Sequence, residues 1–290
     1  MKKLRNILMC VAIGGMFVGC QDLDIPPKNI LSGEDIYNEG GITAYMAGLY
    51  SQLPMEDFNM SNDGSYNGFY NWNCIIWDML STGETVNRNN TGIYIPQKGY
   101  WSMGYKTIRQ ANDLIANLPA YVGKLKGAES WIAEAKFIRA YVYFAMVKRY
   151  GGVPILETPQ EMTDDEKALW VARSSHEECI DFILSDLDYA IENLGKTKVA
   201  GRANNTYVAA AFKSRVALYA GSVARYGQIF NYSGSESGKM LTGIPEGRAN
   251  DYFMQAYKAS KIVEEGGYKL YEGNSDKEAN FREIFANADK

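Results

Sequence analysis

One segment of the chain gathers side chains that could hold a polyhydroxylated ligand. Residues 59–100 are rich in Asn, Gly, Tyr and Trp, poor in helix formers, and too long for an ordinary connection. Aromatic rings stack on sugar rings, while amides and guanidinium groups supply the fixed donors and acceptors that vicinal hydroxyls require. The candidate ligand-binding residues are Trp72, Asn87, Arg88, Asn89, Tyr94 and Tyr100. This pattern favours a glycan-binding loop region.

A structural role for the same segment stays open. Its large apolar side chains would also anchor a long loop to neighbouring helices. These residues are Trp72, Ile75, Ile76, Trp77, Met79 and Leu80. Trp77, together with Trp101 just beyond the segment, fits the anchoring role best.

Catalytic chemistry has weaker support in the sequence. A pair of carboxylates among Asp164, Asp165 and Glu166 could serve as the acid and base of a glycosidase, but these residues are contiguous in a polar linker, with no surroundings that would keep one protonated. His176 lies beside two glutamates, and no serine has the Gly-x-Ser-x-Gly pattern of a hydrolase nucleophile. We therefore expect a binding protein with no catalytic residues.

The amino terminus has the pattern of a bacterial lipoprotein signal. Three cations precede a short apolar run at 7–18, and a small residue stands directly before Cys20. The run is shorter than the roughly 20 apolar residues that a membrane-spanning helix needs. We expect residues 1–19 to be removed and Cys20 to carry acyl chains such as palmitate, which anchor the mature 20–290 domain to a membrane.

Charge and composition argue against other partners. Removing residues 1–19 deletes three positive charges, so the net charge falls from −4 to −7, which disfavours nucleic acid. One histidine, with Cys74 and Cys179, cannot build a usual zinc site, so no metal or cofactor is expected. The two cysteines lie in unrelated segments and are predicted to be unpaired and buried.

Helical periodicity predicts antiparallel helix pairs through residues 101–290. A first helix, preceded by a Ser32–Asp35 capping pattern, precedes the aromatic segment. The predicted helices cover about 42–53, 101–118, a long helix ending at 151, 175–194, 206–223 and 250–265. Ser175 and Glu178 form a Ser-x-x-Glu capping box. The helix at 250–265 opens a third pair, whose second helix is not clearly visible in the sequence.

Two of these helices have predicted core faces. For 206–223 the apolar stripe comprises Val208, Phe212, Val216, Tyr219 and Val223. For 250–265 it comprises Phe253, Ala256, Tyr257 and Val263.

The long helix within 134–156, EAKFIRAYVYFAMVKRYGGVPIL, is the most distinctive segment. Its apolar positions cover more than one stripe, so we expect burial on two sides. Gly151, Gly152 and Pro154 predict a sharp exit. Glu134 and Arg139 are predicted to tie helix pairs together through a salt bridge or hydrogen bond.

The sequences of four segments, in order along the chain, resemble those of SusD-like (RagB/SusD) outer-membrane nutrient-binding lipoproteins of Bacteroidetes. Besides 134–156, they are IRQANDLIANLP (108–119), RSSHEECIDFILSDLDYAIENL (173–194) and GRANNTYVAAAFKSRVALYA (201–220). CQDLDIPPKN, starting at Cys20, is similar to the mature amino termini of this family. The resemblance implies an all-α, irregular tetratricopeptide-like array of antiparallel helix pairs with long inserted loops.

The resemblance also implies a function. SusD-like proteins bind a nutrient at the cell surface and serve as lids on SusC-like TonB-dependent transporters in the outer membrane. Most members serve glycans and some serve peptides. The aromatic residues of segment 59–100 favour a glycan over a peptide as the ligand. The competing class of function is a tetratricopeptide-type interaction scaffold that binds no small ligand.

SusD-like proteins are usually longer than this chain, which stops at NFREIFANADK (280–290). We expect the sequence to be the amino-terminal part of a longer protein, with marginal stability on its own because a terminal repeat lacks its cover.

Overall fold

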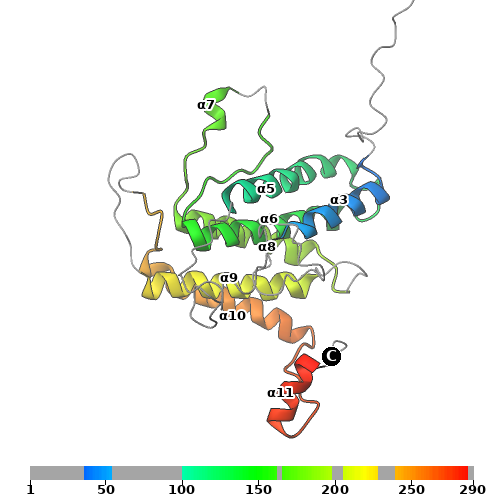
Figure 1. The fold of residues 1–290 in the computed structure, drawn as a ribbon, viewed down its shortest axis with the longest axis vertical. Coiled ribbons are helices and arrows are strands. Elements are labelled where there is room, and N and C mark those ends of the chain that lie inside the picture. Colours follow the sequence, from blue (N-terminus) through cyan, green and yellow to red (C-terminus); the bar gives the residue numbers. More distant parts are fainter. Residues whose placement is uncertain (1–35, 54–99, 162–164, 198–204, 228–238, 287–290) are drawn as a thin grey trace, which may run out of the picture. The chain divides into compact units, whose positions relative to one another are not determined.

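The computed structural model describes residues 36–53, 100–161, 165–197, 205–227 and 239–286, and every regular element in them is helical (Figure 1). The chain divides into two compact units, Met1–Tyr45 and Met46–Lys290. Helix α3 (Glu39–Ser51) crosses the boundary between them. The description below concerns the second unit. The all-α fold predicted from the sequence is confirmed.

Five long helices pack in chain order, each against the next (Figure 1). They are α5 (Tyr100–Asn117), α6 (Ala128–Tyr150), α8 (His176–Asn193), α9 (Thr206–Tyr226) and α10 (Ala249–Glu265). The short elements are η2 (Leu118–Tyr121), α7 (Glu166–Leu169), η4 (Glu246–Arg248) and α11 (Lys277–Ala286). Short connections make α5–α6 and α8–α9 the antiparallel pairs that the periodicity predicts.

Helix α6 is the central element of this stack. Sixteen of its 23 residues are buried, because α5 covers one side and α8 another. Its aromatic residues also reach α9: Phe212 lies with its ring centroid 4.8 Å from that of Tyr141 and 5.6 Å from that of Phe144. Aromatic pairs at these separations add to the stabilisation from burial. The burial on two sides that the sequence predicts is confirmed.

The exit of α6 is sharp because two glycines let other backbone segments approach. Gly151 has φ = 68°, and a Cβ there would lie 2.0 Å from the carbonyl oxygen of Leu241. A Cβ on Gly152 would lie 1.9 Å from the carbonyl oxygen of Ser174. The Gly152 N–H donates to Leu241 O over 2.6 Å. The pair of glycines is therefore required for chain crossing as well as for ending the helix.

Helix α8 begins with the predicted capping box. Glu178 N–H donates to Ser175 Oγ over 3.1 Å, and Ser175 N–H donates to Glu178 Oε2 over 2.7 Å. One turn into the helix, the Cys179 thiol is buried and unpaired, as predicted, and it contacts the backbone of Val153. Burial raises the pKa of this thiol to about 11, so it behaves as a small core residue. Cys74 and the Ser32–Asp35 pattern lie outside the described residues.

The predicted core face of α9 is only partly right. Val208 is 37% exposed and Phe212 is half-buried, whereas the fully buried positions are mostly small. The buried residues are Thr206, Ala209, Ala210, Lys213, Val216, Ala217, Ala220, Gly221 and Ala224. Since α9 lies between α8 and α10, its two contact faces need small side chains that allow close helix packing.

The predicted core face of the third pair is only partly right: Ala256 is buried as predicted, but Tyr257 is not. Tyr257 is 58% exposed, and the buried face of α10 consists of Ala249, Tyr252, Ala256 and Ala259. A second helix, α11, follows, although no apolar period announces it. Local polar contacts define it instead: Asp276 Oδ1 accepts from Glu278 N–H over 3.0 Å, and Tyr271 Oη donates to Glu283 over 2.7 Å.

Candidate functional site

Most of the predicted ligand-binding residues lie outside the described residues. Trp72, Asn87, Arg88, Asn89 and Tyr94 belong to residues 54–99, and Cys20 belongs to residues 1–35. Tyr100 is the first residue of α5. These assignments remain predictions, and the structure describes what holds the two ends of the segment.

The described residues before and after the predicted binding segment are fixed to the helical stack. Before it, Tyr50 on α3 donates from its hydroxyl to Glu134 on α6 over 3.1 Å, and Leu53 is buried. After it, the indole of Trp101 makes a tilted ring contact with Tyr105 and an edge contact with Tyr150, at centroid distances of 5.3 and 5.5 Å. Trp101 keeps 40% of its surface exposed, so the anchoring role predicted for it accounts for part of the side chain.

A buried ionic network ties α5, α6 and α8 together. Arg139 on α6 donates from Nε and Nη2 to the two carboxylate oxygens of Asp186 on α8, over 2.7 and 2.8 Å. Its Nη1 donates to Asn112 Oδ1 on α5 over 2.7 Å. Lys136 adds a second cation 3.0 Å from Asp186. Arg139 and Glu134 therefore link helices, as predicted from the sequence.

A half-buried tyrosine and a buried one fix the chain that leaves α6. Tyr105 on α5 donates to the carbonyl oxygen of Pro154 over 2.7 Å, and Tyr143 on α6 accepts from Leu156 N–H over 2.8 Å. Burial raises the pKa of both phenols above the ordinary value of 10.0, so both stay protonated hydrogen-bonding groups. The exit segment is thus held against α5 and α6.

The acidic triplet has no arrangement suited to acid–base catalysis in the described part of the chain. The Asp165 carboxylate caps α7 by accepting from Lys167 N–H over 3.5 Å. Glu166 is exposed in the first turn of that helix, and Asp164 lies outside the described residues. Among the described residues, no cluster of three or more His, Cys, Asp or Glu could hold a metal ion.

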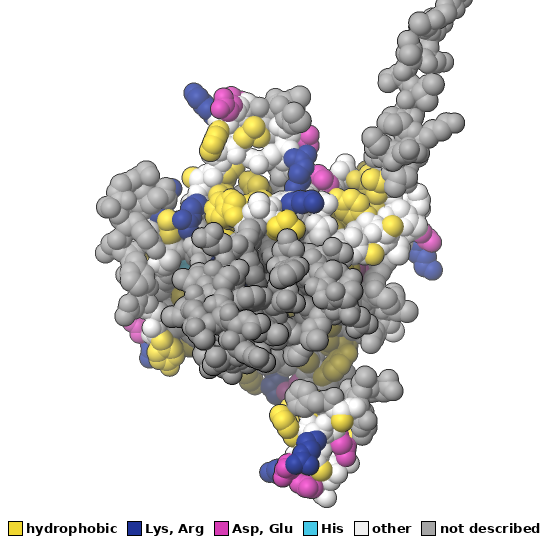
Figure 2. Space-filling view, in the orientation of Figure 1, with side chains coloured by type: hydrophobic (Ala, Val, Ile, Leu, Met, Phe, Trp, Pro, Cys, Tyr) yellow, Lys and Arg dark blue, Asp and Glu magenta, His cyan; other side chains and the backbone are white. Residues whose placement is uncertain are grey.

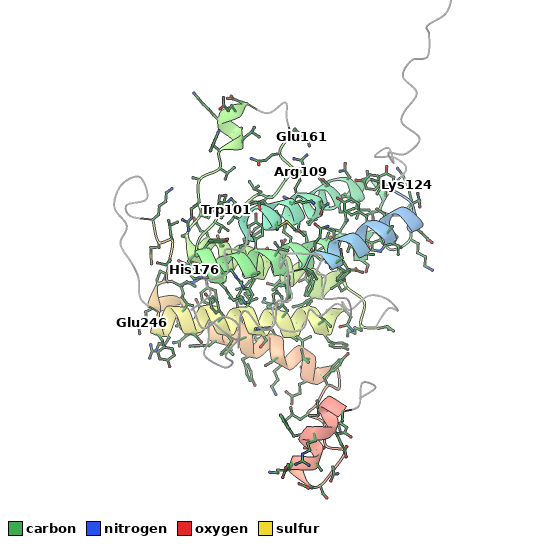
Figure 3. The ribbon with its side chains drawn as sticks, in the orientation of Figure 1. Trp101, Arg109, Lys124, Glu161, His176 and Glu246 are labelled. Carbon is green, nitrogen blue, oxygen red and sulfur yellow. The ribbon has the colours of Figure 1, made fainter. Side chains whose placement is uncertain are left out.

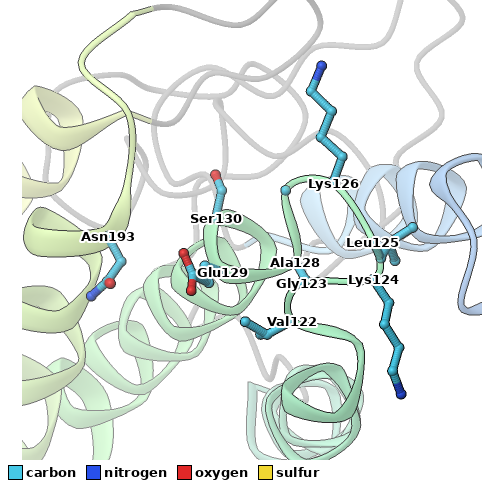
Figure 4. A pocket seen from close by; sticks show the side chains of 10 residues that line it. Val122, Gly123, Lys124, Leu125, Lys126, Ala128, Glu129, Ser130 and Asn193 are labelled. Carbon is cyan, nitrogen blue, oxygen red and sulfur yellow. The ribbon is translucent and has the colours of Figure 1, made fainter.

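A cavity of about 610 Å³ lies at the turn from η2 into α6 (Figure 4). Residues 122–130 line it together with Asn193 at the end of α8. Lys124 and Lys126 extend away from one another, and the remaining side-chain polar groups come from Glu129, Ser130 and Asn193. The cavity offers no aromatic face, so it lacks the stacking surface a sugar site uses.

His176 is a buried histidine with neither ring nitrogen hydrogen-bonded within the described residues. Its ring lies at the start of α8, with its centroid 6.2 Å from that of Tyr219 on α9 (Figure 3). Burial lowers its pKa from 6.5 to about 4. The side chain is therefore a neutral packing element in the folded protein.

This burial predicts a loss of stability on acidification. Between pH 6.5 and about 4 the unfolded chain binds a proton at His176 that the folded chain does not, so the free energy of unfolding falls as pH decreases through that window. We expect a contribution of about 3 kcal/mol. Urea unfolding at a series of pH values measures it, and His176→Leu should flatten the slope above pH 5. Equal slopes in the two proteins would contradict the prediction.

No helix within the described ranges has both the length and the apolar content needed to cross a membrane.

Comparison with known proteins identifies the family. The SusD-like family described as "Starch-binding associating with outer membrane" matches residues 23–218. A SusD-like protein of Bacteroides ovatus is 26% identical over 215 residues, covering 69% of this chain and 37% of that protein. SusD-like protein P2 of Formosa agariphila is 25% identical over 228 residues, covering 76% of this chain and 44% of that protein. The chain thus spans less than half the length of these relatives.

Solved structures show the same fold. A SusD-like protein of Bacteroides fragilis aligns with a TM-score of 0.54 at 23% identity, covering 87% of this chain and 43% of that one. A laminarin-binding SusD-like protein aligns with a TM-score of 0.53 at 19% identity, covering 87% of this chain and 49% of that one. These matches confirm the tetratricopeptide-like arrangement of helices. Since the family match extends over more than half of its residues, this chain belongs to the SusD-like family.

Proposed function

We propose that the protein binds a glycan at the outer membrane and delivers it to a partner TonB-dependent transporter. The observation that carries the proposal is the match to a family described as starch-binding, since the matched residues 23–218 include the aromatic and Asn-rich segment 59–100. A protein of the same fold binds laminarin, a neutral glucan. The helices at both ends of the segment supply a rigid support for such a site.

The proposed role is capture and not catalysis. Stacking on aromatic rings and hydrogen bonds to amides hold a sugar without changing any covalent bond. Glycoside hydrolysis needs two carboxylates at a set separation on either side of the bond, one of them kept protonated. Asp165 caps a helix and Glu166 is exposed, so neither supplies that function.

The proposal includes membrane anchoring through Cys20. Its support is the cation-flanked apolar run before Cys20 and the description of the family as associated with the outer membrane. The proposed partner, a SusC-like transporter, is supported by the family resemblance alone. Mass spectrometry of protein purified from its own membranes tests the anchor: acyl chains on an amino-terminal Cys20 support it, and an unmodified Cys20 contradicts it.

Calorimetric titration of the full mature chain tests the ligand class. We expect saturable heat with at least one of laminarin, soluble starch and xyloglucan, and none with a mixed peptide digest. Binding of peptides alone would favour the peptide-serving alternative. Binding of neither class, with a transporter still copurifying, would favour an interaction scaffold.

Replacing Trp72 tests the predicted binding segment. Trp72→Ala removes a stacking face, so we expect glycan affinity to fall about three- to tenfold while far-ultraviolet circular dichroism stays unchanged. Tyr226→Ala is the matched control, because Tyr226 is an aromatic residue on α9 that is 81% exposed. Unchanged affinity in Trp72→Ala would remove that residue from the site.

A further inference from the structure

An exposed aromatic residue lies on a connection far along the chain from segment 59–100. The connection between α6 and α8 runs from Gly151 to Ser175 and carries the short helix α7. From the end of α7 onward, residues 168–172 form an exposed apolar run in an otherwise polar stretch. Trp170 in this run is 79% exposed, the highest value among the tryptophans of the described residues. We call the described residues of this connection, 151–161 and 165–175, the strap.

The strap is held to the helices along its first limb. Side chains of α5 and α6 donate to a series of its carbonyl oxygens. The bonds are Tyr105 to Pro154 over 2.7 Å, Asn112 to Leu156 over 2.8 Å, Arg139 to Glu157 over 3.1 Å, and Arg109 to Gln160. These contacts make the first limb a fixed base for the rest of the strap.

The second limb is fixed in turn. Gln160 Nε2 donates to the carbonyl oxygen of Leu169 over 3.1 Å, which joins the two limbs beside Trp170. Arg173 donates to the carbonyl oxygens of Gly152 and Tyr150 over 2.7 and 2.6 Å. Trp170 therefore sits between two anchored points.

The indole of Trp170 contributes no ring packing or hydrogen bond to the described part of the fold. Trp101 packs on two tyrosines, whereas the Trp170 side chain makes no ring contact or hydrogen bond with the described residues. An exposed indole on a pre-ordered segment presents a flat apolar face without further conformational cost.

Charged groups accompany this face. Arg109 on α5 and Glu161 on the strap lie 3.7 Å apart, with side chains that are 50% and 61% exposed (Figure 3). Glu161 follows Gln160, whose side chain donates to the backbone carbonyl oxygen of Leu169, the residue before Trp170, so the segments that carry the ion pair and the indole are joined by this bond. Figure 2 shows hydrophobic and charged side chains next to one another around α7 and the strap. An exposed aromatic face and an exposed charged pair at the same anchored strap are the two kinds of group that contact the apolar face and the hydroxyls of a sugar.

We propose that Trp170 and the Arg109–Glu161 pair form a glycan contact separate from segment 59–100, with Trp170 stacking on a pyranose ring and the ion pair binding its hydroxyls. The inference rests on the proposed function and adds a second set of residues to it. The strap and Arg109 together carry charges of both signs, with Glu161, Asp165 and Glu166 among the acids, so the ligand is a neutral oligosaccharide.

Other occupants fit the strap less well. A stable protein interface buries about 800 Å² on each partner, far more than a five-residue apolar run offers. Binding to an anionic lipid surface requires a cluster of cations, whereas the acidic residues around α7 oppose it. A sugar ring needs only one flat face with polar neighbours.

Calorimetric titration with laminarin, soluble starch and xyloglucan tests the contact on the full chain. We expect Trp170→Ala to weaken the binding of the glycan that the wild type takes about three- to tenfold. Trp170→Phe should lose less, because a smaller ring still stacks. Glu161→Ala should also weaken binding. Tyr257→Ala, which removes an exposed aromatic from α10, should bind as the wild type does.

A fluorescence readout separates stacking from a general effect on the fold. Saturating glycan should change the indole emission of the wild type, and the change should shrink in Trp170→Phe. Wild-type affinity in Trp170→Ala, with Trp72→Ala impaired, would overturn this inference and leave the proposed function standing. Absence of binding by the wild type to all three glycans would overturn both.

Discussion

Replacing Arg139 by methionine is expected to lower the free energy of unfolding by about 3–5 kcal/mol, because it leaves a buried carboxylate without its main partner. The Arg139 and Asp186 side chains are each 3% exposed and meet through two hydrogen bonds. Lys136 remains 3.0 Å from Asp186, but its side chain is 21% exposed and its bond is to one oxygen only. Asn112 also loses its donor. Urea unfolding followed by circular dichroism measures the loss.

Two variants control for the charge itself. Arg225→Met removes an exposed ion pair to Glu246, with side chains 51% and 71% exposed, and should cost less than about 1 kcal/mol. Arg139→Met combined with Asp186→Leu removes both buried charges and should recover much of the stability. If the free energy of unfolding of Arg139→Met lies within about 1 kcal/mol of the wild-type value, the network is not the link between α5, α6 and α8 that its geometry indicates.

The helices and their order could be predicted because their signals are local. Ser175 and Glu178 mark the start of α8 within four residues, and Gly227 marks the end of α9. The width of the apolar pattern on α6 also predicts contact on two sides. Each of these features depends on residues one or two turns apart, which a single sequence displays.

The faces of the outer helices could not be predicted in the same way, because they depend on partners distant in the sequence. Tyr252, and not Tyr257, is buried on α10, where its hydroxyl donates to Asp181 of α8 over 2.7 Å. Arg248 donates to the same carboxylate over 2.9 Å. No periodicity in α10 reveals this contact, which joins residues 71 positions apart.

The candidate site, too, could be predicted only in part. Residue types in segment 59–100 predict a sugar ligand, but their spacing says nothing about which rings meet. Trp170 was missed because a single tryptophan in a short apolar run usually indicates burial. The run's position directly after three charged residues, Asp165, Glu166 and Lys167, was the available signal. Only the structure shows that the ring is left exposed.

Alanine at Gly152 is expected to destabilise the protein by more than about 3 kcal/mol, because the added methyl group would overlap backbone that cannot move aside freely. The new Cβ would lie 1.9 Å from the carbonyl oxygen of Ser174 and 2.9 Å from the carbonyl carbon of Ser175. Ser174 N–H donates to Val153 O over 3.1 Å, and Ser175 caps α8. Relief of the overlap would thus displace both the strap and the start of α8.

Gly48→Ala is the matched control for Gly152→Ala, and its effect should have the opposite sign. A Cβ at Gly48 on α3 meets nothing within 4 Å, and alanine favours a helix interior over glycine by about 0.5–1 kcal/mol. In thermal and urea unfolding, Gly48→Ala should therefore be more stable than the wild type and Gly152→Ala less stable. Wild-type stability in Gly152→Ala would mean that the approach of Ser174 to the exit of α6 is relaxed at little cost. The strap would then lack the fixed base on which the placement of Trp170 depends.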